Sequence, residues 1–121
     1  MTALLTLAAM LVPAPVPDLD AAAAAAASTR QPIICGTACK QRTVAPYRAK
    51  LTRMAWCESR GRWGIATGNG YYGGLQFDLP TWRSVGGQGL PHLNPRLEQM
   101  YRAVRLIRRR GYAPWPRCGR M

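Results

Sequence analysis

Three carboxyl groups are the residues best suited to acid catalysis, because from Gln31 onward the chain has no other aspartate or glutamate. They are Glu58, Asp78 and Glu98. Acid-catalysed cleavage of a glycosidic bond needs at least one such group. Asp78 precedes a predicted helical turn, which favours a capping role, and Glu98 can pair with Arg102 one helical turn later in a solvated position. Glu58 is therefore the candidate catalytic acid.

Glu58 is followed by side chains that sugar-binding sites commonly use. It precedes a glycine-rich segment, 59–74, which contains the hairpin signal Asn69-Gly70. Aromatic and amide side chains can stack on pyranose rings and hydrogen-bond to hydroxyl and N-acetyl groups. Candidate substrate-binding residues of these types are Trp63, Asn69, Tyr71, Tyr72, Gln76 and Trp82. A small domain also needs aromatic residues in its core, so a structural role is the alternative for Trp63 and Trp82.

Three helices are predicted to position these side chains. The first spans 46–57, the second begins at Asp78 as N-cap and ends at Gly86-Gly87, and the third spans about 95–110. The third helix has an apolar face made of Leu97, Met100, Tyr101, Val104 and Ile107. Segment 59–74 is predicted to be a loop with at most a short irregular hairpin. We therefore predict a small, compact, mainly α domain.

The N-terminal segment does not have the pattern of a packed fold. It contains an apolar run, 3–12, a proline-rich stretch and seven alanines, 21–27, for which a helix is the alternative to a linker. The apolar run is too short to span a bilayer but suits a secretory signal, although no Lys or Arg precedes it. We expect 1–30 to be a signal peptide and Ala/Pro-rich segment, 31–45 an N-terminal extension, and 46–121 the catalytic domain of a secreted, cell-wall-associated protein without a stable membrane span.

The net charge of +12 indicates a polyanionic partner. Nucleic acid and the acidic bacterial cell wall both fit, and charge does not choose between them. A cationic antimicrobial or nucleic-acid-binding protein is disfavoured, because no nucleic-acid motif accompanies the charge.

Four cysteines, Cys35, Cys39, Cys57 and Cys118, indicate two disulfides in a short exported chain, with three possible pairings. A bond between Cys57 and Cys118 would close a long loop and stabilise the domain by about 4 kcal/mol. Cys35 and Cys39 are four residues apart and can close on each other. Zinc binding by four thiolates is the alternative, but zinc sites usually have two closely spaced pairs and this chain has one. We therefore expect no metal and no cofactor.

Several motifs resemble those of the resuscitation-promoting factors of actinobacteria. The matching residues are Cys57-Glu58-Ser59, Trp63, the run 67–77, Thr81-Trp82, Gly86-Gly87, Ala113, Trp115-Pro116 and Cys118-Gly119. The resemblance covers roughly 47–119, and the run 67–77 is its most specific part. It implies a lysozyme-like α+β, mostly helical domain that acts on peptidoglycan, with a disulfide between Cys57 and Cys118. It also implies that Glu58 is the catalytic acid and that Thr81 belongs to the active site.

One departure from the family pattern lies beside the proposed acid. After Cys-Glu-Ser the family typically continues Gly-Gly-Asn-Trp, whereas this chain has Arg60-Gly61-Arg62-Trp63. Nearby cations favour the ionised carboxylate and lower its pKa, which opposes the work of a general acid near neutral pH. The conflict disappears if Arg60 and Arg62 point into solvent or toward substrate carboxylates. The orientation of Arg60 and Arg62 therefore decides whether the pKa of Glu58 suits a general acid.

With one convincing carboxyl group, the hypothesis is that Glu58 protonates the glycosidic oxygen between MurNAc and GlcNAc. As carboxylate it would then deprotonate water or the MurNAc C6 hydroxyl, and the second route gives the 1,6-anhydro product of a lytic transglycosylase. Thr81 or Gln76 would stabilise the oxocarbenium-like intermediate. The resemblance further implies a role in cell-wall remodelling and in resuscitation from dormancy. We expect the protein to be a monomer that binds peptidoglycan glycan strands. A peptidoglycan endopeptidase is a candidate protein partner. The alternative is a peptidoglycan-binding or signalling module with little turnover.

Overall fold

The computed structural model describes Pro13 and residues 34–121. Its helices are α2 (Thr37–Val44), η1 (Ala45–Tyr47), α3 (Arg48–Ser59), α4 (Leu79–Ser84), η2 (Pro91–Leu93), α5 (Arg96–Arg110) and η3 (Cys118–Arg120). The η elements are single 3-10 turns. Residues 35–121 form one compact unit. The predicted fold class, mainly α and held by disulfides, is confirmed, whereas the predicted signal segment lies outside the described residues apart from Pro13 and stays a prediction.

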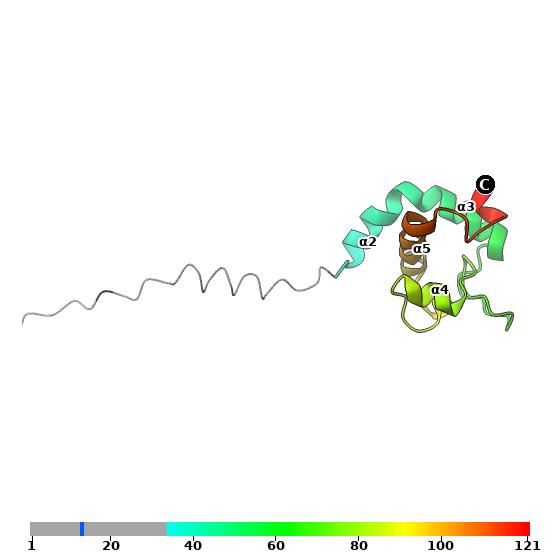
Figure 1. Cartoon of the computed structure of the whole chain (residues 1–121), viewed down its shortest axis with the longest axis horizontal. Coiled ribbons are helices and arrows are strands. Elements are labelled where there is room, and N and C mark those ends of the chain that lie inside the picture. Colours follow the sequence, from blue (N-terminus) through cyan, green and yellow to red (C-terminus); the bar gives the residue numbers. More distant parts are fainter. Residues whose placement is uncertain (1–12, 14–33) are drawn as a thin grey trace, which may run out of the picture. The chain divides into compact units, whose positions relative to one another are not determined.

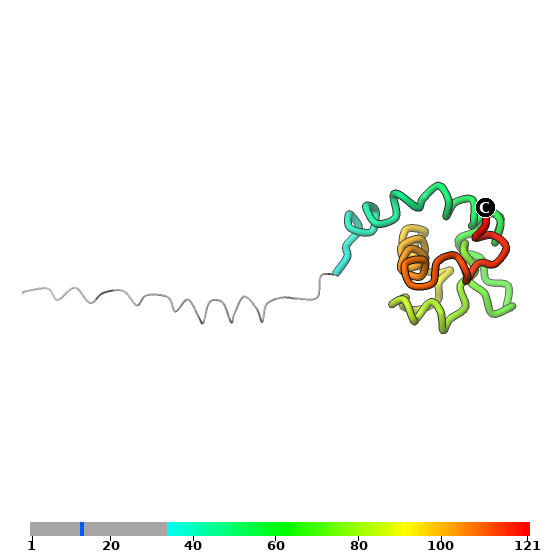
Figure 2. Tube along the Cα trace, turned by 45° about the horizontal axis from the view of Figure 1, so that its top comes forward, coloured from blue at the N-terminus to red at the C-terminus, as the bar shows by residue number. Residues whose placement is uncertain are grey.

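The other elements pack around α5. Figures 1 and 2 show α5 between the arc formed by α2 and α3 on one side and α4 on the other. The apolar face predicted for this helix is confirmed, since four of its members are buried and Leu97 is partly buried against the same core: Met100, Tyr101, Val104 and Ile107. Arginines fill the exposed face and the last turn. Because apolar residues recur every three or four positions, α5 buries one continuous stripe.

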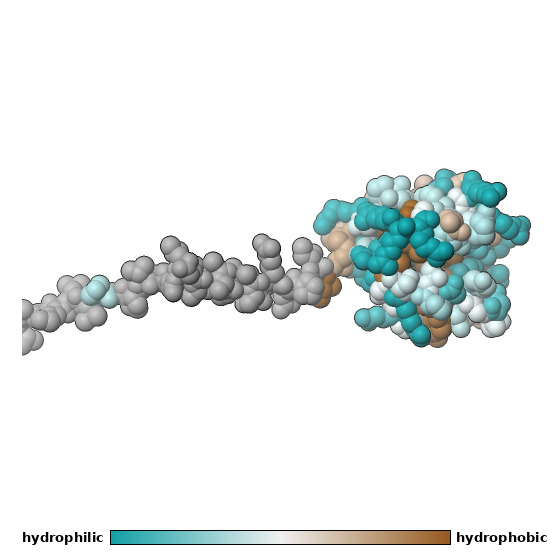
Figure 3. All heavy atoms as spheres, in the orientation of Figure 1, coloured by the Kyte–Doolittle hydropathy of each residue, from teal (hydrophilic) through white to brown (hydrophobic). Residues whose placement is uncertain are grey.

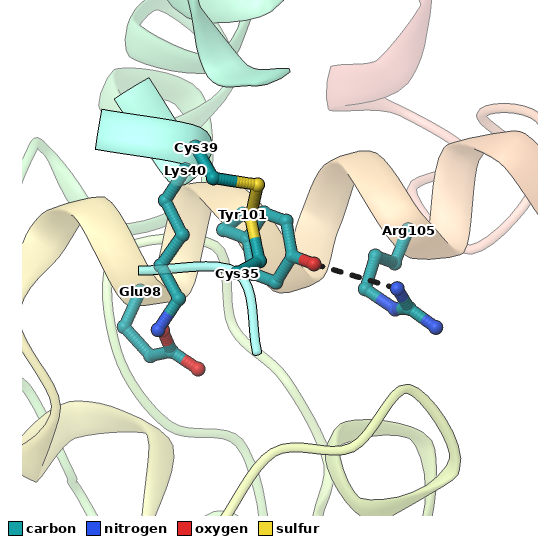
Figure 4. Close-up of a disulfide and its surroundings, with 6 residues drawn as sticks. All are labelled: Cys35, Cys39, Lys40, Glu98, Tyr101 and Arg105. Carbon is teal, nitrogen blue, oxygen red and sulfur yellow. Dashed lines mark hydrogen bonds and ion pairs between the residues drawn. A yellow bond between two sulfur atoms is a disulfide. The ribbon is translucent and has the colours of Figure 1, made fainter. Parts of the chain in front are cut away.

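α2 is a helix that the sequence patterns did not predict. The disulfide between Cys35 and Cys39 ties the segment just before the helix to the first turn of the helix. Val44 at its other end is fully buried. In Figure 4 the Lys40 side chain extends from α2 to Glu98 on α5. The described part of the predicted extension, residues 35–45, thus contributes a helix to the compact unit.

The Glu98 carboxylate binds cations from two helices. Its Oε1 accepts a hydrogen bond from Arg102 Nε at 2.6 Å, and its Oε2 accepts one from Lys40 Nζ. Burial alone would raise the pKa of Glu98, but the hydrogen bonds and charges of Lys40 and Arg102 outweigh burial and hold its pKa below the usual value. The predicted pairing with Arg102 is confirmed. The predicted solvated position is wrong, because Lys40 covers the carboxylate and leaves the Glu98 side chain 14% exposed.

α3 begins and ends two residues later than the predicted 46–57, because Pro46 opens the 3-10 turn η1 instead. Glu58 therefore lies inside the last turn of α3. The helix ends at Ser59, and its C-cap residue Arg60 has a left-handed φ of 59°. Left-handed backbone favours glycine, so an arginine here carries a conformational cost of about 1 kcal/mol. That geometry directs the chain away from the α3 axis and into the glycine-rich loop.

The loop and α4 follow the predicted pattern. Two isolated antiparallel bridges, Ala66 to Tyr72 and Tyr72 to Phe77, make the short irregular hairpin. Asp78 caps α4, and its Oδ1 accepts a hydrogen bond from the Thr81 backbone N–H at 2.8 Å. The predicted N-cap is confirmed, and the Asp78 carboxylate is engaged in this capping hydrogen bond.

Hydrophilic side chains cover most of the molecular face in Figure 3, with apolar atoms in small patches. This surface agrees with the excess of cations over acids. Among the described residues, no helix combines the length and hydrophobicity that a membrane crossing requires.

Candidate active site

A cavity of about 390 Å³ lies between the end of α3 and the C-terminal tail. Glu58, Tyr71 and Gln76 line it on one side. The rest of the lining is Cys57 on α3 and five residues of the tail: Pro114, Trp115, Pro116, Arg117 and Cys118. The cavity therefore brings the predicted acid together with an aromatic and an amide side chain from the glycine-rich loop.

A disulfide between Cys57 and Cys118 joins the two walls of this cavity. This pairing, implied by the family resemblance, is confirmed, and so is closure of Cys35 on Cys39. The zinc alternative is wrong, because all four cysteines are bonded in pairs and no thiolate remains. Fixing the tail beside Glu58 is the structural result of the longer bond.

Glu58 has the electrostatic character of a general acid. The side chain is partly buried, and this burial raises the pKa of its carboxyl group above the usual value, while the Arg117 charge opposes the rise. A raised pKa extends the protonated form toward neutral pH, as a proton donor requires. In the part of the chain that the structure describes, Glu58 is the one carboxyl group that lines this cavity.

The cations that follow Glu58 in sequence are occupied elsewhere. The Arg60 guanidinium lies over the ring of Trp56, 5.8 Å from its centroid. The Arg62 Nε donates a hydrogen bond to the Ser59 carbonyl oxygen at 2.9 Å. The pKa of Glu58 is raised and not lowered, so the conflict expected from the proximity of Arg60 and Arg62 in sequence does not arise. The cation that acts on the carboxyl group is Arg117.

Hydrogen bonds from three directions hold the glycine-rich loop against α3. The Ser59 hydroxyl bonds to the Gly74 carbonyl oxygen at 2.9 Å. The Gly74 backbone N–H donates to Gln99 Oε1 at 2.9 Å, and Trp115 Nε1 donates to the Leu75 carbonyl oxygen at 2.9 Å. The backbone immediately before Gln76 is therefore fixed from α3, from α5 and from the tail.

Gln99 connects the loop to the start of α5 through three hydrogen bonds. Besides accepting from Gly74, it donates through Nε2 to the carbonyl oxygens of Trp63 and Asn94, each at 2.9 Å. The side chain is fully buried. Gly73 has a φ of 80°, and a side chain there would collide with the Gln99 amide. Glycine at this position thus lets the loop approach α5 closely.

We expect Gln99→Met to destabilise the protein by about 3 kcal/mol, because a side chain of similar volume would leave three backbone groups, one buried and two partly buried, without partners. Urea unfolding without added reductant, so that both disulfides stay intact, measures this change in the free energy of unfolding. The matched control is Gln41→Met at an exposed position of α2, where the change should stay within about 0.5 kcal/mol. Similar values for the two variants would contradict the role of Gln99.

Gln76 has strained backbone within the site. Its φ is 54°, which is uncommon for a residue with a side chain and is found disproportionately at functional sites. Its Nε2 donates to the Gly73 carbonyl oxygen at 2.9 Å. This bond uses the amide nitrogen and leaves the amide oxygen available as an acceptor, on a side chain that lines the same cavity as Glu58.

Five predicted site residues do not line the cavity: Trp63, Asn69, Tyr72, Thr81 and Trp82. Trp82 is fully buried, with the edge of Phe77 against its ring. Trp63 is packed against the core and lines a separate groove, where the Arg96 guanidinium lies 5.0 Å from its ring centroid. For Trp82 the burial favours the structural alternative over substrate binding.

The other three residues make contacts outside the cavity lining. Asn69 Oδ1 accepts a hydrogen bond from the Tyr71 backbone N–H at 3.0 Å and so shapes the turn that presents Tyr71. Tyr72 stacks on His92 with ring centroids 5.4 Å apart. Thr81 lies in the first turn of α4, where its backbone N–H binds the cap Asp78. A catalytic role for Thr81 stays a prediction from the family resemblance.

Sequence reasoning missed Arg117 and Gln99. Arg117 precedes Cys118, and Glu58 follows Cys57, so pairing of these two cysteines places residues 58 and 117 close together. That pairing was the available signal for Arg117. No local pattern marks Gln99, because its partners lie 5, 25 and 36 residues away in sequence.

Comparison with known proteins identifies relatives across this region. Residues 45–118 match the model of a transglycosylase-like domain. The chain is 52% identical over 66 residues to resuscitation-promoting factor Rpf of Micrococcus luteus, covering 54% of this chain and 30% of that protein. It is 47% identical over 74 residues to resuscitation-promoting factor RpfE of Mycobacterium tuberculosis, covering 61% of this chain and 43% of that protein. Each match spans less than half the length of the relative.

Proposed function

The chain belongs to the transglycosylase-like family of resuscitation-promoting factors, and from this membership we propose that it cleaves the glycan strands of bacterial peptidoglycan. The bond is the β-1,4 linkage between MurNAc and GlcNAc, and Glu58 is the catalytic acid. The observation that carries the proposal is the placement of Glu58, whose pKa burial raises, in a cavity beside Tyr71 and Gln76. Cleavage would remodel the wall and promote the resumption of growth that the relatives' names describe.

The first chemical step needs one proton donor. The Glu58 carboxyl group gives its proton to the glycosidic oxygen, the bond from MurNAc C1 to that oxygen breaks, and the GlcNAc hydroxyl leaves. The electron-poor C1 centre then needs stabilisation that a second carboxylate usually supplies. Asp78 caps α4 and Glu98 pairs with Lys40, so neither supplies it. The amide oxygen of Gln76 is the candidate from this chain.

In the second step the Glu58 carboxylate takes a proton from the attacking oxygen. If the MurNAc C6 hydroxyl attacks C1, the product is a 1,6-anhydro sugar and no water is consumed. If water attacks, the product is a reducing MurNAc, which is heavier by the elements of one water molecule.

Mass spectrometry of soluble products from purified sacculi tests the proposal. The purified chain should release muropeptides, and the presence or absence of the added water assigns the route. A second candidate function, glycan binding with little turnover, is favoured by Arg117, because its charge opposes the protonated state of Glu58. Binding to sacculi without any released product would support that candidate and refute the enzymatic proposal.

Substitution of Arg117 should change the pH dependence of activity. The proton donor works only while protonated, so activity falls as pH rises through the pKa of Glu58. Arg117 lowers this pKa, and Arg117→Gln should therefore raise it further and move the falling alkaline limb to higher pH. The measurement is kcat/KM against pH on soluble glycan, which reports the free enzyme.

Arg60→Gln is the matched control for this profile, since it removes the same charge from a residue that stands two positions from Glu58 in sequence but lies over Trp56. Its alkaline limb should coincide with that of the wild type. An equal displacement by both variants would show that total charge, and not the position of Arg117, sets the pKa.

A further inference from the structure

Arg117 is held in the cavity wall by its neighbours on both sides. Trp115 is buried and bonded to the Leu75 carbonyl oxygen, and Cys118 is bonded to Cys57. Between these two fixed points the Arg117 side chain is exposed and lines the same cavity as Glu58. Its position relative to the acid is thus set by the tail and does not depend on a mobile loop.

The Arg117 guanidinium has no structural partner in residues 34–121. Both ion pairs in this part of the chain use Glu98, which binds Lys40 and Arg102. Arg60, Arg62 and Arg96, by comparison, each contact a ring, a carbonyl or a hydroxyl group. The protonated form of Glu58 offers Arg117 no countercharge. When Glu58 is protonated, the cavity therefore presents a cation without a countercharge among residues 34–121.

A guanidinium group is suited to one kind of ligand. Its planar set of N–H donors matches the two oxygens of a carboxylate, and such charge-assisted bonds are stronger than neutral ones. Peptidoglycan carries carboxylates in two places: on the lactyl group of MurNAc where the stem peptide is absent, and along the stem peptide where it is present. A polymer of GlcNAc has the same glycosidic linkage and no carboxylate.

We propose that Arg117 is a substrate-binding residue that recognises a carboxylate carried by the muramyl unit, so that this cavity selects acidic peptidoglycan strands over neutral GlcNAc polymers. The inference deepens the proposed function and rests on it for the identity of the glycan. Among the described residues, Arg117 is the only cation that lines the cavity, and the proposal gives it a role in substrate selection.

Substrate recognition of this kind also supports the acid. When a substrate carboxylate neutralises Arg117, the charge that lowers the pKa of Glu58 is cancelled. An acidic strand thereby favours the protonated form of Glu58, and a neutral strand does not. Binding and proton donation are coupled through one side chain.

Binding measurements on a Glu58→Gln variant test the proposal, because this variant does not turn the ligand over. Glutamine is also uncharged, as protonated Glu58 is, so the charge at residue 58 matches that of the active acid. Isothermal titration compares three tetrasaccharides: alternating GlcNAc and MurNAc with free lactyl carboxylates, the same sugar with stem peptides, and chitotetraose. Adding Arg117→Gln should weaken binding of at least one acidic ligand by about tenfold and change the chitotetraose affinity by less than about twofold. The acidic ligand that responds identifies the carboxylate.

Two further variants are controls for the role of the Arg117 guanidinium group. Arg120→Gln removes the same charge from an exposed residue outside the cavity and should leave all three affinities unchanged. Arg117→Lys keeps a charge without the planar donor set and should lose less affinity than Arg117→Gln. Equal losses for acidic and neutral glycans, or no loss for any, would overturn the proposal. If the acidic preference depends on Arg117 but the wild type releases no product from sacculi, the carboxylate site stands and the enzymatic function fails.

Discussion

Glu58→Gln is expected to lower the rate of muropeptide release by about 10³-fold, because glutamine has nearly the same shape as glutamate but no acidic proton to transfer. Glu58 lines the cavity at the end of α3, and no other carboxyl group in the described residues reaches it. No second acid in the site can therefore take over its function. The measurement is the initial rate of product release from sacculi at a pH where the wild type is fully active.

The same substitution should not destabilise the fold. Burial raises the pKa of Glu58 in the folded state, so folding favours the protonated form and the wild type loses stability as pH rises through the range between the unfolded and folded pKa values. The glutamine side chain of the variant does not titrate, and the melting temperature of Glu58→Gln should equal or exceed that of the wild type at neutral pH. Inactivity would then not be a consequence of unfolding.

Glu98→Gln is the matched control, because it makes the same chemical change outside the cavity. It weakens the contacts with Lys40 and Arg102, so the melting temperature should fall while activity persists at a permissive temperature. The two variants thus predict opposite patterns of stability and activity. Comparable release by Glu58→Gln and wild type would refute the assignment of the catalytic acid.

The helices were predictable because local patterns determine them. The apolar spacing from Leu97 to Ile107 on α5 and the cap at Asp78 act within a few residues, and both predictions are confirmed. α2 escaped prediction because its segment has little apolar periodicity of its own. It is held by the short disulfide at Cys35 and by contacts with Glu98, which lies 58 residues from Lys40 in sequence.

The site was predictable in part for the same reason. Glu58, Tyr71 and Gln76 belong to the motifs that resemble the family, and the fold places all three in one cavity. Residue type alone did not separate Trp82, a core residue, from residues that face a ligand. Aromatic rings serve both purposes, and only the packing of Phe77 and Gly87 around Trp82 distinguishes them.

The electrostatics of the acid depended on geometry that sequence proximity does not report. Arg60 is two residues from Glu58, but the left-handed turn at the end of α3 directs it over Trp56. Arg117 is distant in sequence, and the Cys57 to Cys118 bond brings it to the cavity. The charge that acts on the acid is therefore not the nearest charge in sequence.

Replacing Cys57 and Cys118 together by alanine is expected to cause the largest loss of stability. The bond closes a loop with a sequence separation of 61, and on the chain-entropy model its removal costs about 4 kcal/mol. For a domain of this size the melting temperature should fall by roughly 15 to 30 °C. Scanning calorimetry without reductant measures the change.

The disulfide between Cys35 and Cys39 provides the control. Comparing the two double variants separates the contribution of the Cys57 to Cys118 bond to stability from its contribution to the site. Cys35 and Cys39 close a loop with a separation of four, so their double alanine variant should lose only about 2 kcal/mol on the same model and keep its activity. Loss of the Cys57 to Cys118 bond should also abolish most activity at temperatures where the domain remains folded, because the tail that carries Arg117 would leave the cavity wall. Full activity of the folded double variant would show that the bond stabilises the domain without building the site.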